Sequence, residues 1–250
     1  MTFPKYRLIL PAALLAAIVV GSIALAHTAP VPFLLEYVRP GESVWHMPPS
    51  DGAPTIYLTY DDGPNPTATP ALLDVLAREG VRATFFVIPD HLTPATAPIV
   101  RRALAEGHGV ALHSGSRALM LKSPDDLARL LEAQAARIAS LTGHALCPLF
   151  RPHAGWRGGA MYEGLEQAGY RLAGWSFGMW DWHWWRRPDP RALADRLASK
   201  ASDGDIVVMH DGHHENPRAD RLATVEATAR LIARLRDRGF TFGQLCEAAS

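Results

Sequence analysis

The chain has 250 residues and carries 25 basic and 25 acidic side chains, which leaves no net charge. This length allows one sizeable domain with its own core and a short additional segment. A nucleic-acid-binding protein needs a basic excess gathered on one face, so no nucleic acid is expected as a partner. Nothing in the sequence indicates an oligomeric state.

The N-terminus is predicted to be a membrane or export segment. Lys5 and Arg7 precede an uncharged apolar run of nineteen residues, from Leu8 to Ala26. Such a run, as a helix, nearly matches the roughly 30 Å hydrocarbon core of a bilayer. The basic flank favours a single-pass anchor over residues 1–26, with the rest of the chain outside the cytoplasm. The alternative is a cleaved signal peptide and a secreted or periplasmic protein, because Ala24-Leu25-Ala26 resembles a cleavage site.

Residues 27–54 are predicted to form a tether. They are rich in proline and glycine and lack sustained periodicity, apart from a short helical piece near residues 33–37. The two cysteines of the chain, Cys147 and Cys246, are too few for a disulfide framework and lack the spacing of a metal site. One disulfide in an oxidising compartment and two buried thiols are both compatible with this pattern.

Residues 55–250 are predicted to form one α/β domain. Segments of helical spacing separate seven short apolar or β-branched runs, at 55–60, 83–88, 109–113, 148–151, 171–176, 205–210 and 240–242. The clearest helix follows Ser123, a capping residue, and another extends from about residue 221 to 238 before Gly239. This alternation predicts a parallel sheet, compact enough for a closed or nearly closed barrel.

Side chains suited to catalysis or metal binding follow these runs. They are Asp61 and Asp62 after the first, His113 at the third, Arg151 at the fourth, Asp181 beyond the fifth and His210 at the sixth. The carboxyl ends of the strands in such a barrel meet at one rim, so we expect these side chains to lie together. There one aspartate can bind a divalent cation while its neighbour takes a proton from water, and a histidine can protonate a leaving nitrogen.

Five motifs, in order, make a family resemblance specific. Tyr60-Asp61-Asp62-Gly63-Pro64 is similar to the first motif of the polysaccharide deacetylases, carbohydrate esterase family four. The family's second to fifth motifs are matched, in order, by residues 107–114, Arg151-Pro152 with Gly155, Asp181-Trp182 and Val208-Met209-His210. The resemblance extends from residue 55 to the C-terminus. It implies a distorted (β/α)7 barrel that removes N-acetyl groups from amino sugars with zinc or a similar divalent ion.

The resemblance also implies a role for each matching residue. Asp61 would be the general base, oriented by Arg151. Asp62 and His113 would be metal ligands. His210 would be the general acid, with Asp181 holding its tautomer and raising its pKa. The backbone amide near Ala154 would contribute to the oxyanion hole. Trp182 belongs to a tryptophan cluster that could be either a platform for the sugar or core packing.

One expected ligand is missing. The family's second motif has a second histidine four residues after the first. In this chain that position holds Arg117. Either the arginine has replaced the histidine, or a deletion just before Arg117 has removed it. Arginine has no lone pair for a metal, and a catalytic zinc usually has three protein ligands. Four histidines on expected rim loops are candidates to replace it, although for each one taken alone an ordinary loop residue is the favoured interpretation: His153, His183, His213 and His214.

Two functions follow from this pattern. The first is a metal-dependent hydrolase that removes N-acyl groups from a cell-envelope glycan or a lipid-linked sugar. The second is a catalytically impaired barrel that binds a glycan or another partner, which the missing ligand motivates. Retention of Asp61 and His210 favours the enzyme, because a binding module needs no acid–base pair.

Overall fold

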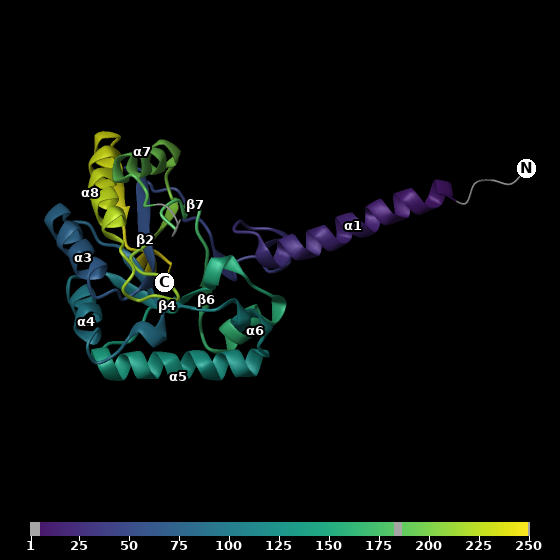
Figure 1. The fold of residues 1–250 in the computed structure, drawn as a ribbon, viewed down its shortest axis with the longest axis horizontal. Helices are drawn as coiled ribbons and strands as arrows, with labels where there is room; N and C mark the ends of the chain where they lie inside the picture. The colour runs from purple at the N-terminus through teal and green to yellow at the C-terminus, as the bar shows by residue number, and fades with distance from the viewer. Residues whose placement is uncertain (1–5, 183–186, 250) are drawn as a thin grey trace, which may run out of the picture.

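The computed structural model describes residues 6–182 and 187–249. A long helix, α1 (Tyr6–Thr28), projects from a domain in which helices cover the outside of a curled sheet (Figure 1). The strands are β1 (Ser43–Val44), β2 (Thr55–Gly63), β3 (Thr84–Val87), β4 (Gly109–His113), β5 (Leu149–Arg151), β6 (Arg171–Ala173), β7 (Phe177–Gly178), β8 (Ile206–His210) and β9 (Thr241–Gly243). The other helices are α2 (Leu34–Val38), α3 (Ala68–Glu79), α4 (Ala97–Ala105), α5 (Pro124–Thr142), α6 (Gly159–Gln167), α7 (Pro190–Lys200), α8 (Leu222–Asp237) and α9 (Leu245–Ala248).

The sheet has the topology of a distorted barrel. Its strands pair in parallel in the order β1-β6-β5-β4-β3-β2-β8-β7, and β9 pairs with the start of β2. Among the described residues no pairing joins β1 to β7, so the barrel is not closed by hydrogen bonds between strands. The predicted distorted (β/α)7 fold is confirmed. The seven predicted strands correspond to β2–β6, β8 and β9, whereas the two-residue strands β1 and β7 were not predicted.

Alternation along the strands separates two cores. In β8, Val207 and Met209 pack with the covering helices, whereas Ile206 and Val208 face the inside of the curled sheet. His210 has the same parity as Val208 and lines the pocket inside. The inward positions at the strand ends are therefore the ones that can carry chemistry.

Helix α5 follows the predicted start and stop signals. Ser123 accepts a hydrogen bond from the backbone of Asp126 at 3.3 Å, and Pro124 occupies the first helical position. Gly143 ends the helix with a φ of 79°, a conformation that favours glycine. Helix α8 likewise matches the second predicted helix to within a residue at each end.

The structure differs from the expected tether over residues 27–54. Strand β1 pairs with β6, and Trp45 and Met47 are buried. A Cβ atom on Gly174 would lie 2.1 Å from the Trp45 ring, so this glycine makes room for the indole. Because burial of such a ring offsets the cost of ordering the chain, the second half of the segment packs as part of the domain.

The two cysteines form a disulfide that joins residues 99 positions apart. Cys147 precedes β5, and Cys246 lies in α9, against the start of β4. A Cβ atom on Gly109 would approach the Cys246 sulfur to 2.7 Å, so the close packing requires glycine there. Of the two alternatives left open by the sequence, the structure has the disulfide.

Removal of this bond should weaken the domain. The double variant Cys147→Ala/Cys246→Ala should lose about 2–5 kcal/mol of unfolding free energy, because the unfolded chain is no longer constrained by a long closed loop. Urea unfolding followed by circular dichroism measures this loss. A reductant should destabilise the wild type to the same extent and leave the variant unchanged. Equal unfolding midpoints for oxidised wild type and variant would contradict the prediction.

Candidate active site

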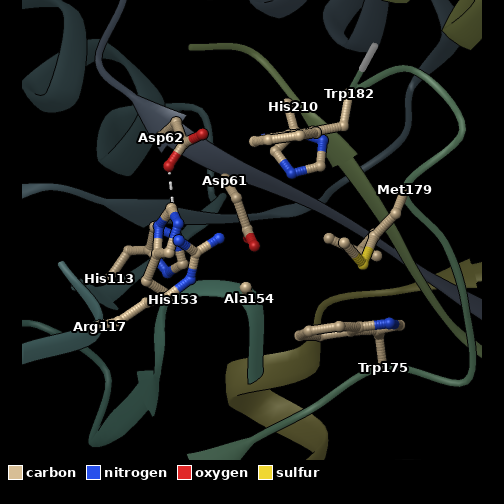
Figure 2. Close-up of a pocket in the computed structure, with 11 residues that line it drawn as sticks. Asp61, Asp62, His113, Arg117, His153, Ala154, Trp175, Met179, Trp182 and His210 are labelled. Carbon is tan, nitrogen blue, oxygen red and sulfur yellow. Dashed lines mark ion pairs between the residues drawn. The ribbon is translucent and has the colours of Figure 1, made fainter. Parts of the chain in front are cut away.

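Inward-facing polar residues meet in a pocket of about 530 Å³ at the carboxyl ends of the strands. Figure 2 shows its lining residues, which are Asp61, Asp62, His113, Arg117, His153, Ala154, Trp175, Met179, Trp182, Val208 and His210. Six of the eight sequence-predicted site residues are in this lining. The other two, Arg151 and Asp181, are buried and bond to lining residues. The structure thus brings the predicted residues together.

Arg151, at the end of β5, holds Asp61, at the end of β2. Its Nη1 donates to Asp61 Oδ1 at 2.7 Å and to Thr59 Oγ1 at 2.8 Å. Its remaining donors reach the carbonyls of Ala173 at 3.3 Å and Gly174 at 2.8 Å. A fully buried guanidinium is tolerated when its donors are satisfied and an opposite charge compensates it. One oxygen of Asp61 is therefore fixed in position beside the pocket.

Asp62 points into the pocket because the backbone departs from regular strand geometry. Strict alternation would place it on the opposite face from Asp61. Its φ of 72° is left-handed, and the β2–β3 register shifts between Asp61 and Gly63. Asp62 Oδ1 consequently lies 3.2 Å from His113 Nε2 (Figure 2). His113 Nδ1 donates to the carbonyl of Arg151 at 2.8 Å, which fixes the tautomer and leaves Nε2 facing Asp62.

A third candidate ligand, His153, joins this pair. Asp62, His113 and His153 each offer a ligand atom within 4.8 Å of the others. Asp62 Oδ1 and His153 Nδ1 are buried without a hydrogen bond, which is costly unless something else binds them. Burial and the nearby His113 charge lower the pKa of His153 to about 3, so its ring is neutral at pH 7. Two imidazoles and a carboxylate fit a divalent ion such as zinc or cobalt.

Two of the other candidate histidines, His213 and His214, are not part of this group. His214 packs its ring against that of His153 at 4.4 Å, and His213 stacks on His214 at 4.7 Å. His183 lies outside the described residues. The sequence signal for His153 was its position two residues after Arg151, at a predicted strand end. The pairing of β4 with β5, which sets His113 opposite Arg151, is known only from the structure. Sequence reasoning named it only as one of four alternatives.

Arg117 takes no part in ligation. Its guanidinium lies over the Trp156 ring, 5.0 Å from the centroid, and the side chain is exposed at the pocket rim. No carboxylate within the described ranges forms an ion pair with it. The residue at the position of the missing histidine is thus a cation beside the pocket with no carboxylate partner in the part of the chain that the structure describes.

His210, at the end of β8, forms a buried pair with Asp181. His210 Nδ1 lies 2.9 Å from Asp181 Oδ1, and Asp181 Oδ2 accepts from the His210 backbone at 2.7 Å and from Thr224 Oγ1 at 3.0 Å. Burial alone would lower the pKa of His210, but the Asp181 charge and hydrogen bond outweigh it and raise that pKa. Because Nδ1 is engaged, Nε2 is the nitrogen left to exchange a proton with a bound molecule.

Aromatic side chains form the apolar walls of the pocket. The rings of Trp175 and Trp182 lie on opposite sides of the open space, with Met179 between them at one edge (Figure 2). Trp182 is nearly parallel to the rings of His213 and His214, with interplanar angles of 12°. Such flat faces suit the apolar face of a sugar ring. Trp175 and Met179 were not predicted as pocket residues.

Asp211 supports the turn that carries both aspartates. Its backbone N–H and that of Gly212 donate to the carbonyl of Asp61 at 3.2 and 3.3 Å, and Thr69 donates to its carboxyl group. Burial raises the pKa of Asp211 to about 7. A Cβ atom on Gly63 would lie 2.5 Å from this carboxyl group, so the residue after Asp62 must be glycine.

Comparison with known proteins agrees with this geometry. The chain is 36% identical over 201 residues to a chitooligosaccharide deacetylase of Sinorhizobium fredii, covering 78% of this chain and 91% of the relative. It is 30% identical over 213 residues to a peptidoglycan-N-acetylglucosamine deacetylase of Bacillus cereus, covering 83% and 92%. A family 4 acetyl xylan esterase of Clostridium thermocellum, solved in complex with a cobalt ion, superimposes with a TM-score of 0.68 at 27% identity, covering 78% and 89%.

Residues 49–173 also match the sequence pattern of the polysaccharide deacetylases. This match covers half of the chain, and both relatives above align with the larger part of it. Enzymes of this group are metal-dependent hydrolases that act on the amide bond of N-acetyl sugars. The chain therefore belongs to the polysaccharide deacetylase family, carbohydrate esterase family 4.

Proposed function

We propose that this protein is an N-deacetylase of envelope amino sugars that uses a divalent cation held by Asp62, His113 and His153. The observation that carries the proposal is the buried cluster of these three side chains. In it, His153 would take the place of the histidine that the family has at the position of Arg117. The relatives act on chitooligosaccharide and on peptidoglycan N-acetylglucosamine, which makes a glycan containing N-acetylglucosamine the expected substrate class. We take zinc as the expected ion, because two histidines and one carboxylate form a common catalytic zinc set.

The residues around the trio can divide the reaction between them. A bound divalent cation supplies a Lewis acid that polarises the acyl carbonyl and makes a nearby water more acidic. Asp61, fixed by Arg151, takes the proton of the water that adds to the carbonyl carbon. His210 donates a proton to the sugar nitrogen as the carbon–nitrogen bond breaks, which releases acetate and a free amine. The backbone amide near Ala154 is suited to stabilise the negative oxygen, and Trp182 to bind the sugar face.

We further propose that α1 is retained as a membrane anchor. It is long and apolar enough to cross a bilayer, and only 6% of its Pro11–Thr28 stretch is buried against the domain. Ala26, at the possible cleavage site, is buried where the helix meets the domain. The Cys147–Cys246 disulfide supports a location outside the cytoplasm, since such bonds persist in oxidising compartments.

The activity itself can be tested with a single conservative change. Wild-type protein with added zinc or cobalt should release acetate from N-acetylglucosamine oligomers. Asp61→Asn should lower kcat about 10²–10⁴-fold, because it removes the general base while keeping the side-chain size. Asp237→Asn, an exposed change at the end of α8, is the matched control and should retain full activity. Equal turnover by Asp61→Asn and wild type, or none by either, would refute the proposal.

The identity of the third ligand is tested by metal binding, independently of turnover. His153→Ala should weaken zinc binding measured by calorimetry by more than about 100-fold, since loss of an outer partner of a ligand alone typically costs about 10- to 100-fold. His214→Ala changes the neighbouring ring and should have a much smaller effect. If zinc bound tightly only after Arg117→His, the natural trio would not be a complete site.

The pH dependence of kcat/KM should reveal the protonation of His210, which is paired with Asp181. The acid form of His210 is present below its raised pKa and is lost as pH rises through it, so kcat/KM should fall on the alkaline side. Asp181→Asn removes the charge that stabilises the imidazolium and should move this limb to lower pH by at least about one unit. Thr224→Val removes one hydrogen bond to Asp181 without changing a charge and should shift it less. An alkaline limb that stays in place in Asp181→Asn would exclude this assignment.

A further inference from the structure

Helix α1 is attached rigidly to the loop that forms one side of the active-site pocket. The fully buried Arg157 donates from Nη1 to the carbonyl of Ala29 at 2.6 Å and from Nη2 to that of Val31 at 2.9 Å. Its Nε and Nη2 also bond to Glu36, at 2.5 and 3.0 Å, and its backbone N–H donates to His27 at 3.0 Å. These contacts begin at the last turn of α1, so the end of the helix is held in place against the domain.

The same loop lines the pocket. Arg157 Nη1 donates to the carbonyl of Gly155 at 2.9 Å, and a Cβ atom on Gly155 would lie 3.7 Å from Pro30. The preceding residues, His153 and Ala154, are part of the pocket lining. The chain just after α1 therefore packs against the same loop that carries the proposed metal ligand His153.

Exposed apolar side chains surround the exit of α1. Outside α1, the described residues include six large exposed hydrophobic side chains, and five of them lie in residues 31–38 or in the short 3-10 helix η2 (Arg117–Leu121). We call these five the apolar collar: Val31, Leu34, Tyr37, Val38 and Leu121, which are between 44% and 81% exposed. Both parts adjoin the helix end, because α2 packs against α1, and both His27 and Met120 lie within 4 Å of a Cβ atom on Gly158.

The collar continues the bare surface of α1. The helix projects away from the domain (Figure 1), and its leucine, isoleucine and valine side chains from Leu14 to Leu25 are about half exposed or more. Its 23 residues span about 34 Å, enough for a bilayer core of about 30 Å. Apolar side chains with a tyrosine among them, next to such a span, are typical of the membrane–water interface.

A cation lies between the pocket and the collar. Helix η2 carries Arg117 at the pocket rim and Leu121 in the collar. Arg117 has no carboxylate partner in the described part of the chain, and its guanidinium could form paired hydrogen bonds with a phosphate. A sugar joined to a lipid through phosphate would place its anion on the membrane side of the pocket.

On these grounds we infer that the apolar collar rests on the bilayer that α1 crosses, and that the pocket beside it takes an N-acylated amino sugar linked through phosphate to a membrane lipid. The inference rests on the proposed deacetylase function for its chemistry. In the reaction, water adds to the acyl carbon and the carbon–nitrogen bond breaks, while the phosphate link to the lipid stays intact.

The experiment uses the full chain in phosphatidylcholine–phosphatidylglycerol vesicles with two substrates. One is N-acetylglucosamine linked through diphosphate to a polyprenol, and the other is a soluble N-acetylglucosamine oligomer. A flexible insertion of about eight Gly and Ser residues between Thr28 and Ala29 would add roughly 15 Å of reach above the membrane. The same insertion between the exposed Gly143 and His144, beyond α5, is the matched control.

The insertion at Thr28 should lower kcat/KM for the lipid-linked substrate about 10-fold or more, because the site is no longer held at the surface where the substrate is concentrated. Turnover of the soluble oligomer should be unchanged, and the control insertion should affect neither substrate. Wild type that hydrolyses the oligomer but not the lipid-linked sugar would overturn the inference and leave the proposed function standing. Wild type that hydrolyses neither would overturn both.

A second measurement tests the membrane contact without turnover. A fluorophore attached at Leu121→Cys should be quenched by nitroxide-labelled lipids, whereas one at Asp237→Cys, at the exposed end of α8, should not. The native cysteines are joined in a disulfide and would not compete for the label. Equal quenching at the two positions, or none at Leu121→Cys, would show that the collar does not rest on the bilayer.

Discussion

The geometry of the active site depends on one buried, positively charged side chain, that of Arg151. The Arg151 guanidinium links the ends of three strands, because it bonds to Asp61 on β2 and to carbonyls at and just beyond the end of β6, while it is itself part of β5. Its own carbonyl accepts from His113 on β4. A charge buried in this way is costly unless every partner is in place, so the strand ends can adopt few other arrangements. The same bonds that satisfy the arginine position the proposed base and one proposed ligand.

A metal site is defined by where ligand atoms meet in space. Residues at different positions in the sequence can bring a ligand atom to the same point. In this chain the residue at the family's usual position is Arg117, whereas His153 reaches the Asp62–His113 pair from the neighbouring strand end. Parallel strands make this exchange possible, because consecutive rim loops converge on one opening. In the proposed site the displaced position is available for another use, and it holds Arg117, which has no carboxylate partner among the described residues.

The N-terminal segment and the site are parts of one structure. Arg157 ties the end of α1 to the loop of His153 and Ala154 through carbonyls and the Glu36 carboxylate. The pocket consequently has a fixed relation to the helix axis. A long flexible tether would let a domain search a thick polymer, whereas a short rigid link restricts it to what lies near the helix exit. This constraint is imposed by packing, and it would give an enzyme anchored through α1, as proposed, a preferred direction of approach.

Much of the fold was determined by the sequence alone. Short apolar or β-branched runs, segments of helical spacing and the cap at Ser123 are local signals, and they predicted seven strands and the two long helices. The motifs at strand ends predicted the pocket residues Asp61, Asp62, His113 and His210, since the carboxyl ends of parallel strands must share a rim. The tertiary structure decided what depends on contacts between distant residues. It placed His153, rather than His213 or His214, beside Asp62 and His113, paired the two cysteines, and packed Trp45 against Gly174 where a tether was expected. None of these outcomes follows from local pattern, because each is fixed by the distance between atoms that are far apart along the chain.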